Sequence, residues 1–197
     1  MSTPDTDTIS LSAEELCTRI ETLTTSMMDF WKSAHGWAPI EAAGLLNRSM
    51  LEWQASLSTS LRHWVSASSD GDLILAWANL GALVEGQLKL FLSVYYNDYS
   101  ADADAIRDRR GRFTDPDGST LEPIRQFFVR RIWDVGPDWN PYVARIQQRR
   151  NAIHAFRERD IGTFEDWRNE LPVHLSFVRD INSSVPYPDT IYEPREN

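Results

Sequence analysis

The amino-acid sequence predicts an all-α protein, an up-and-down bundle of about five to six helices. Apolar residues recur at helical spacing over most of the 197 residues, and the chain holds only 9 glycines. Capping boxes that begin at Ser12 and Thr163 mark helix starts near both ends of the chain. No stretch alternates apolar and polar residues over a useful strand length, so no sheet is expected.

Two helices are expected in the first third of the chain. The first runs over residues 13–34 and is ended by residues 35–39, which contain a glycine and a proline. The second is a long amphipathic helix whose apolar positions cover residues 45–64 and which ends near Ser66.

The third expected helix is the most apolar and runs from about residue 73 to residue 97. Gly81 and Gly86 on it permit close contact with other helices. Its length would suit a membrane span, but four polar residues interrupt it, namely Asn79, Glu85, Gln87 and Lys89. A buried central helix is therefore predicted, with no membrane partner.

The second half of the chain predicts three more helices. They are one over residues 121–133, one from Pro141 that turns Ile153 and Phe156 inward, and one from Thr163 that is interrupted near Pro172. The polar segment between the third and fourth helices, residues 99–120, reads as one long mobile loop.

A chain of this length fits one domain, which we expect over residues 11–185. Residues 1–10 are polar and acidic, without the features of a signal peptide, and are expected to be a disordered lead. Residues 186–197 contain three prolines and are expected to be an irregular tail.

Cysteine and histidine usage excludes several kinds of site. The single cysteine, Cys17, rules out an intramolecular disulfide and a cysteine-clustered zinc site, which suits a reducing cytoplasm. The four histidines are scattered and do not form a His-Glu-x-x-His pair, so neither a metal site nor a cofactor is predicted.

The charge of the chain is uneven along the sequence. The formal net charge is -9, which argues against a broad basic surface, yet residues 106–160 carry 12 arginines and 8 acidic residues. Arginine suits phosphate because its planar guanidinium donates in pairs. RNA-binding candidates in this region are Arg107, Arg109, Arg110 and Arg112. A solvated charged face is the alternative interpretation.

The strongest candidate for chemistry is the segment over residues 149–154, Arg-Arg-Asn-Ala-Ile-His. On an α-helix, Arg150 and His154 would share one face, while Arg149 would lie about 140° from His154 around the axis. Asn151 is close enough in sequence to orient the imidazole. A similar pattern ends at His174. It is the poorer candidate, because Pro172 within it would disturb the helix that has to place the arginine and histidine side chains together.

These side chains suit cleavage of RNA without a metal. Histidine titrates near neutral pH, with an ordinary pKa of about 6.5, and can move a proton on or off the 2'-hydroxyl or the leaving oxygen. Arginine can stabilise the negative charge that develops on the phosphate. The catalytic candidates are therefore His154 with Arg149 or Arg150, supported by Asn151.

The chain resembles the HEPN superfamily in three features. They are the motif itself, its place late in a helical chain, and an acid on an earlier apolar helix, namely Glu85 within Leu-Val-Glu-Gly-Gln-Leu-Lys (residues 83–89). The resemblance covers about residues 70–185. It implies a homodimer that brings two motifs together over one RNA cleft. It also implies products that end in a 2',3'-cyclic phosphate, and a biological role as a toxin or antiviral effector. An antitoxin or another protein partner is implied as well.

Two questions stay open at the level of sequence. Family members that read Arg-Asn place the histidine four residues after the asparagine, whereas Asn151 is three before His154, so Arg149 and Arg150 both remain candidates. Glu85 needs a partner if buried, which Arg149, Arg150 or Lys89 can provide. A noncatalytic helical adaptor with an acidic first half is the alternative function, and a nucleotide-sensing bundle is a weaker third.

Overall fold

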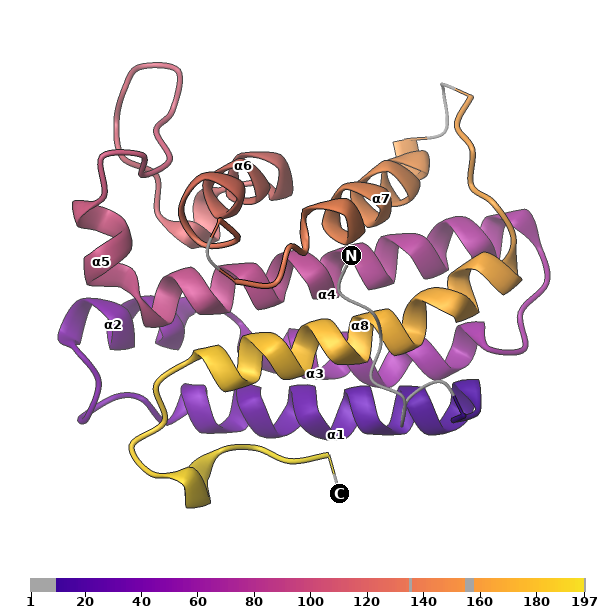
Figure 1. Cartoon of the computed structure of the whole chain (residues 1–197), viewed down its shortest axis with the longest axis horizontal. Coiled ribbons are helices and arrows are strands. Elements are labelled where there is room, and N and C mark those ends of the chain that lie inside the picture. The colour runs from indigo at the N-terminus through magenta and orange to yellow at the C-terminus, as the bar shows by residue number, and fades with distance from the viewer. Residues whose placement is uncertain (1–9, 135, 155–157, 197) are drawn as a thin grey trace.

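The computed structural model describes residues 10–134, 136–154 and 158–196, and within them the chain is all-helical (Figure 1). The α-helices are α1 (Ala13–Lys32), α2 (Ile40–Arg48), α3 (Leu51–Ser60), α4 (Asp70–Val94), α5 (Tyr96–Ala101), α6 (Leu121–Arg131), α7 (Asn140–Arg150) and α8 (Phe164–Ser184). The 3₁₀ turns are η1 (Leu61–Trp64), η2 (Pro116–Gly118), η3 (Asn151–His154) and η4 (Thr190–Tyr192). The predicted all-α class is confirmed, with more helices than expected.

The long helix α4 lies at the centre of the bundle (Figure 1). It contacts α3 and α8 on one side and α6 and α7 on another, while α1 packs against α3 and α8. One apolar core runs through these helices and includes Trp31, Trp77 and Trp167, each at most 2% exposed. The burial of α4 confirms the prediction of a central helix, and no helix among the described residues is long and apolar enough to cross a membrane.

The prediction of one long second helix was wrong. The chain breaks at Met50, whose φ of 38° and ψ of 47° are left-handed, so α2 and α3 are separate helices. The hydroxyl of Ser49 donates to the carbonyl of Leu45 at 2.6 Å. Serine bonded to the backbone in this way competes with helix continuation. The apolar periodicity runs through the break because both helices pack on the same core.

Smaller departures concern the ends of helices. The third expected helix also divides, because the chain turns at Tyr95 and restarts as α5. Pro172 does not interrupt α8, which is continuous to Ser184. Both capping boxes form as predicted, with Glu15 closing the first and Asp166 the second. Most of the expected lead, residues 1–9, lies outside the described residues.

The loop after α5 is held in place by local hydrogen bonds. The hydroxyl of Tyr99 donates to the carbonyl of Thr114 at 2.9 Å and accepts from the amide of Ile106 at 3.3 Å. Arg107 and Phe113 form an isolated antiparallel bridge, and the carboxylate of Asp108 accepts three bonds from Arg110 and Arg112. We call residues 106–114 the arginine loop, which projects from the bundle (Figure 1).

The tail after α8 is irregular apart from η4, but it is tied to the bundle. The hydroxyl of Tyr187 donates to Asn182 at 2.7 Å and accepts from the indole of Trp31 at 3.3 Å. The carboxylate of Glu196 pairs with Arg179 on α8 and with Arg19 on α1. The tail thus connects the first and last helices.

Helices α4 and α7 are in close contact at Gly81. A Cβ atom built on Gly81 would lie 2.8 Å from the Cβ and 2.5 Å from the Cδ of Arg150. These atoms belong to the inner part of the arginine side chain, which cannot move without shifting α7. Gly81 is therefore required for the packing that places Arg150.

We predict that Gly81→Ala lowers the free energy of unfolding by about 1–3 kcal/mol, because the added methyl group overpacks this contact. Gly44→Ala on α2 is the matched control, since a Cβ there meets nothing within 4 Å. It should stabilise the protein by about 0.5–1 kcal/mol through helix propensity. Thermal and urea unfolding measure both; equal effects in the two variants would contradict the packing argument.

Candidate functional site at the end of α7

The candidate motif lies where α7 ends, and it does not lie on one α-helix as expected. Arg149 and Arg150 occupy the last turn of α7, whereas Asn151 to His154 form the 3₁₀ turn η3. A 3₁₀ turn has three residues per turn, so side chains three apart eclipse one another. His154 therefore does not share a helix face with Arg150 as expected. Instead, the three-residue spacing puts Asn151 and His154 on the same side of the turn.

Arg150 belongs to an ion-pair triad with Glu85 and Lys89 of α4. Its guanidinium donates to Glu85 at 2.6 Å and to the carbonyl of Gly81 at 3.3 Å, and the Lys89 ammonium lies 2.8 Å from the same carboxylate. Burial alone would raise the pKa of Glu85, but bonds from Lys89 and Arg150 outweigh it and lower the pKa below its ordinary value. Of the three partners expected as alternatives for Glu85, Arg150 and Lys89 both bind it, whereas Arg149 pairs with Asp160 instead.

Arg149 has a different environment. It donates to Asp160 at 2.8 Å, and its guanidinium lies 5.7 Å from the centre of the Trp77 ring. It also lies against Gly162, whose φ of 62° and missing Cβ leave room for the guanidinium. Only 17% of the Arg149 side chain is exposed. Arg149 therefore fastens the segment before α8 onto α4.

Arg150 borders an open hollow of about 340 Å³ between α3, α4 and η3. The polar side chains around it are Gln54, Glu85, Lys89 and Arg150. Ile153 also borders it and is 49% exposed, so the expectation that Ile153 faces inward was wrong. Phe156, expected to face inward as well, lies outside the described residues. His154 is exposed but does not line this hollow.

Asn151 borders a second hollow, of about 260 Å³, rather than the one beside Arg150. Its charged neighbours there are Glu122, Arg125 and Arg159, and Arg125 pairs with Glu122 at 2.7 Å. The structure therefore places the polar residues of the motif on two sides of the α7 end.

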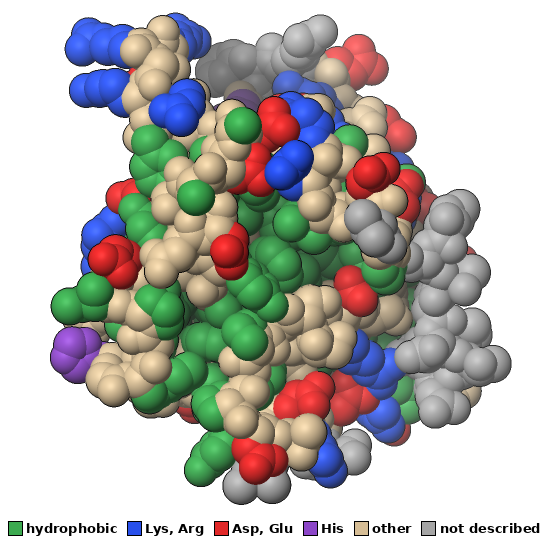
Figure 2. All heavy atoms as spheres, turned by 60° about the vertical axis from the view of Figure 1, so that its left-hand side comes forward, with side chains coloured by type: hydrophobic (Ala, Val, Ile, Leu, Met, Phe, Trp, Pro, Cys, Tyr) green, Lys and Arg blue, Asp and Glu red, His purple; other side chains and the backbone are tan. Residues whose placement is uncertain are grey.

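The four arginines proposed to bind RNA are all exposed on the arginine loop. In Figure 2, basic side chains gather on the segment that projects at the upper left of the molecule. The loop lies beyond the C-terminal end of α4, whereas Arg150 contacts Gly81 in the middle of that helix (Figure 1). At 1.5 Å per residue along α4, the separation is on the order of 20 Å. The loop and the motif are thus separate surfaces.

His174, which ends the competing pattern, is fully buried. Its Nδ1 lies 2.9 Å from the hydroxyl of Tyr142, and burial lowers its pKa to about 3. His174 is therefore closed to a substrate by its burial, whereas Pro172, on which the preference for His154 rested, leaves α8 intact.

Comparison with models of protein families, with curated proteins and with solved structures finds no match to this chain. Among the residues that the structure describes, there is no group of three or more His, Cys, Asp or Glu side chains that could hold a metal ion. The candidate site therefore stands on its own geometry.

Sequence reasoning missed several neighbours of the motif. Gln54 reaches the hollow from α3, with its amide packed over Gly86 and 3.5 Å from the carbonyl of Ala82. Asp160 and Gly162, which hold Arg149, follow the motif in an irregular segment. The spacing of apolar residues carries no information about polar contacts between distant segments. Gly86 did, however, indicate that another helix approaches α4 closely at that position.

We predict that Arg149→Ala lowers the free energy of unfolding by about 1–2 kcal/mol, because it removes a cation–π contact, an ion pair and the packing of the arginine stem. Arg107→Ala, on the exposed arginine loop, should change it by less than about 0.5 kcal/mol. Urea unfolding of both variants measures the difference. If Arg149→Ala left the free energy of unfolding unchanged, this arginine would not be needed for stability and would be free for another role.

We predict that stability falls as the pH decreases from about 6.5 towards 3. In this range the unfolded chain protonates His174 and the folded chain does not, so the unfolded state binds more protons. His174→Gln should flatten the pH dependence by up to about 1.4 kcal/mol per pH unit. His63→Gln, an exposed control, should keep the wild-type slope; chemical unfolding between pH 4 and 7 compares the three.

Proposed function

We propose that this chain is a HEPN-type, metal-independent endoribonuclease in which His154 moves the proton and Arg150 binds the phosphate. One observation carries the choice of Arg150: the Glu85 carboxylate is held between Arg150 and Lys89 at the edge of an open hollow. A carboxylate bound by two cations marks a position that suits a phosphate oxygen.

In the proposed reaction the 2'-oxygen of RNA attacks the adjacent phosphorus and the 5'-oxygen leaves. A base takes the proton from the 2'-hydroxyl, and an acid gives one to the leaving oxygen. His154, exposed at the end of η3, serves as one of these two groups and water as the other. Arg150 stabilises the charge on the non-bridging oxygens once Glu85 has released it.

The arginine loop fits this proposal as a second contact with RNA. Its four exposed arginines can bind backbone phosphates without reading sequence. An RNA that touches both the loop and Arg150 must span on the order of 20 Å, so the proposal favours a strand over a mononucleotide. The homodimer, a toxin or antiviral role, an antitoxin partner and a cytoplasmic location rest on the family resemblance.

The alternative, a noncatalytic adaptor, is favoured by a different observation. Arg149 and Arg150 are both engaged in ion pairs. The exposed apolar side chains of Met50 and Trp53 border a neighbouring hollow, which shares Gln54, Gly86 and Lys89 with the one beside Arg150. Trp53 is 63% exposed and Met50 is 43% exposed. Such side chains commonly anchor protein partners.

The decisive test is cleavage of a labelled single-stranded RNA by the full chain in EDTA. We expect cleavage that leaves a 2',3'-cyclic phosphate, reduced about 10²–10⁴-fold by His154→Ala. Arg150→Ala should reduce it to a similar degree, with the His63→Ala control unchanged.

Two outcomes would sink the nuclease proposal. One is the absence of cleavage by the folded wild-type protein at any salt concentration, which would leave the adaptor. The other is undiminished cleavage by His154→Ala, which would show a contaminating nuclease.

A further inference from the structure

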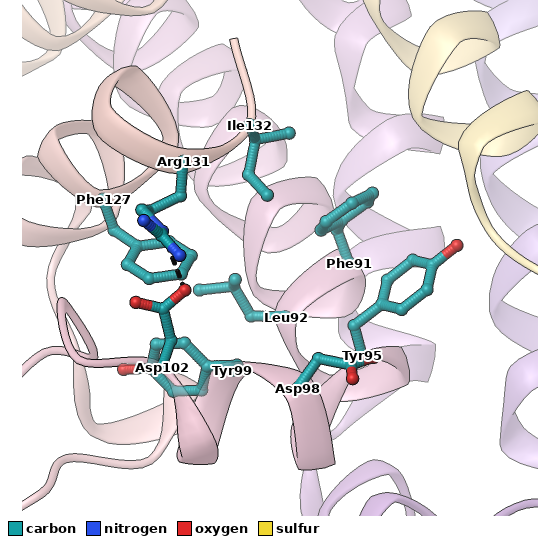
Figure 3. A pocket seen from close by; sticks show the side chains of 9 residues that line it. All are labelled: Phe91, Leu92, Tyr95, Asp98, Tyr99, Asp102, Phe127, Arg131 and Ile132. Carbon is teal, nitrogen blue, oxygen red and sulfur yellow. Dashed lines mark hydrogen bonds and ion pairs between the residues drawn. The ribbon is translucent and has the colours of Figure 1, made fainter. Parts of the chain in front are cut away.

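A pocket of about 260 Å³ lies between the C-terminal end of α4, α5 and the end of α6 (Figure 3). It lies on the face turned forward in Figure 2, where apolar side chains gather below the projecting loop. Aromatic rings and aliphatic side chains form its wall, with three charged groups at its edge. The aromatic members are Phe91, Tyr95, Tyr99 and Phe127.

The walls of this pocket are fixed in place. Tyr95 donates to the carbonyl of Ser184 at 2.8 Å and Tyr99 to that of Thr114 at 2.9 Å, so both hydroxyls are held by backbone oxygens. The rings of Tyr99 and Phe127 meet edge to face at 5.1 Å, and each residue is 2% exposed. A pocket with such walls is preformed, so a ligand would not have to order them.

The edge of the pocket carries an excess of negative charge. Arg131 pairs with Asp102 at 2.8 Å, which leaves neither group free. Asp98 stands next to Tyr95 at the edge and is exposed, and it forms no ion pair within the part of the chain that the structure describes (Figure 3). After burial, its charge is the second cause that raises the pKa of Tyr95. One uncompensated carboxylate therefore faces the opening.

We propose that this pocket binds a small organic amine, with its apolar body among the aromatic side chains and its ammonium group beside Asp98. Aromatic rings attract cations as well as apolar groups, and the carboxylate adds direct attraction. The volume of about 260 Å³ is just below the usual range for ligand pockets, so it suits a molecule smaller than a typical drug. A carboxylate or phosphate ligand would be repelled by Asp98, because Arg131 is already paired.

This site goes beyond the proposed nuclease and does not depend on it. The pocket shares no lining residue with either hollow at the end of α7. The ligand would, however, touch Asp102, the residue by which Arg131 holds the beginning of the segment that leads to the arginine loop.

The test uses three probes of similar shape: 2-phenylethylamine, neutral 2-phenylethanol and anionic 3-phenylpropanoate. Titration of the isotope-labelled full chain, followed by amide NMR shifts, measures each dissociation constant. We expect the amine to bind saturably with a roughly millimolar constant and to shift amides of residues 91–102 and 127–132. The alcohol should bind about two- to five-fold more weakly, and the anion more weakly still.

Two variants locate the site. Asp98→Asn should reduce amine affinity to that of the alcohol, whereas Asp29→Asn, at an exposed position on α1, should leave it unchanged. Ile132→Trp should fill the pocket and abolish binding of all three probes, with its fold checked by thermal unfolding. Equal affinity for the amine and the anion, saturable shifts elsewhere, no saturable binding, or no response to Asp98→Asn would overturn the proposal.

Discussion

The contact between α4 and α7 at Gly81 is the constraint on which the candidate site depends. The absence of a side chain there lets the stem of Arg150 lie on the α4 backbone, where its guanidinium reaches both Glu85 and the Gly81 carbonyl. The rotational position of α7 on α4 is set by this contact, and the direction in which η3 leaves follows from it. The chemistry of the site thus rests on one packing detail.

Much of the fold could be predicted, because burial imposes a period on the sequence. The apolar run of α4, the capping boxes at Ser12 and Thr163 and the helix after Pro141 are all local signals. The break at Met50 and the 3₁₀ turn after Arg150 could not be read in this way. Each changes the backbone over a few residues without disturbing the apolar pattern around it. The helical geometry assumed for His154 failed for that reason.

The candidate site was predictable in composition but only partly in arrangement. The arginine-rich region looks basic when its charges are counted, yet its arginines pair with acids from several elements. Arg145 bonds Glu170, Arg131 bonds Asp102 and Arg149 bonds Asp160. The arginines of the arginine loop, by contrast, are all exposed. Pairing across the bundle depends on tertiary contacts, which no count along the sequence can supply.

The bond network around Glu196 has a consequence for synthesis of the protein. Helix α1 leaves the ribosome before α8, but part of its apolar face is covered by α8 and by the tail that Glu196 fastens to Arg19. About 130 residues separate the end of α1 from the start of α8. At usual elongation rates this delay is on the order of ten seconds. During that interval the part of the α1 face that α8 covers in the folded protein stays exposed, because the helix that buries it has not yet been made.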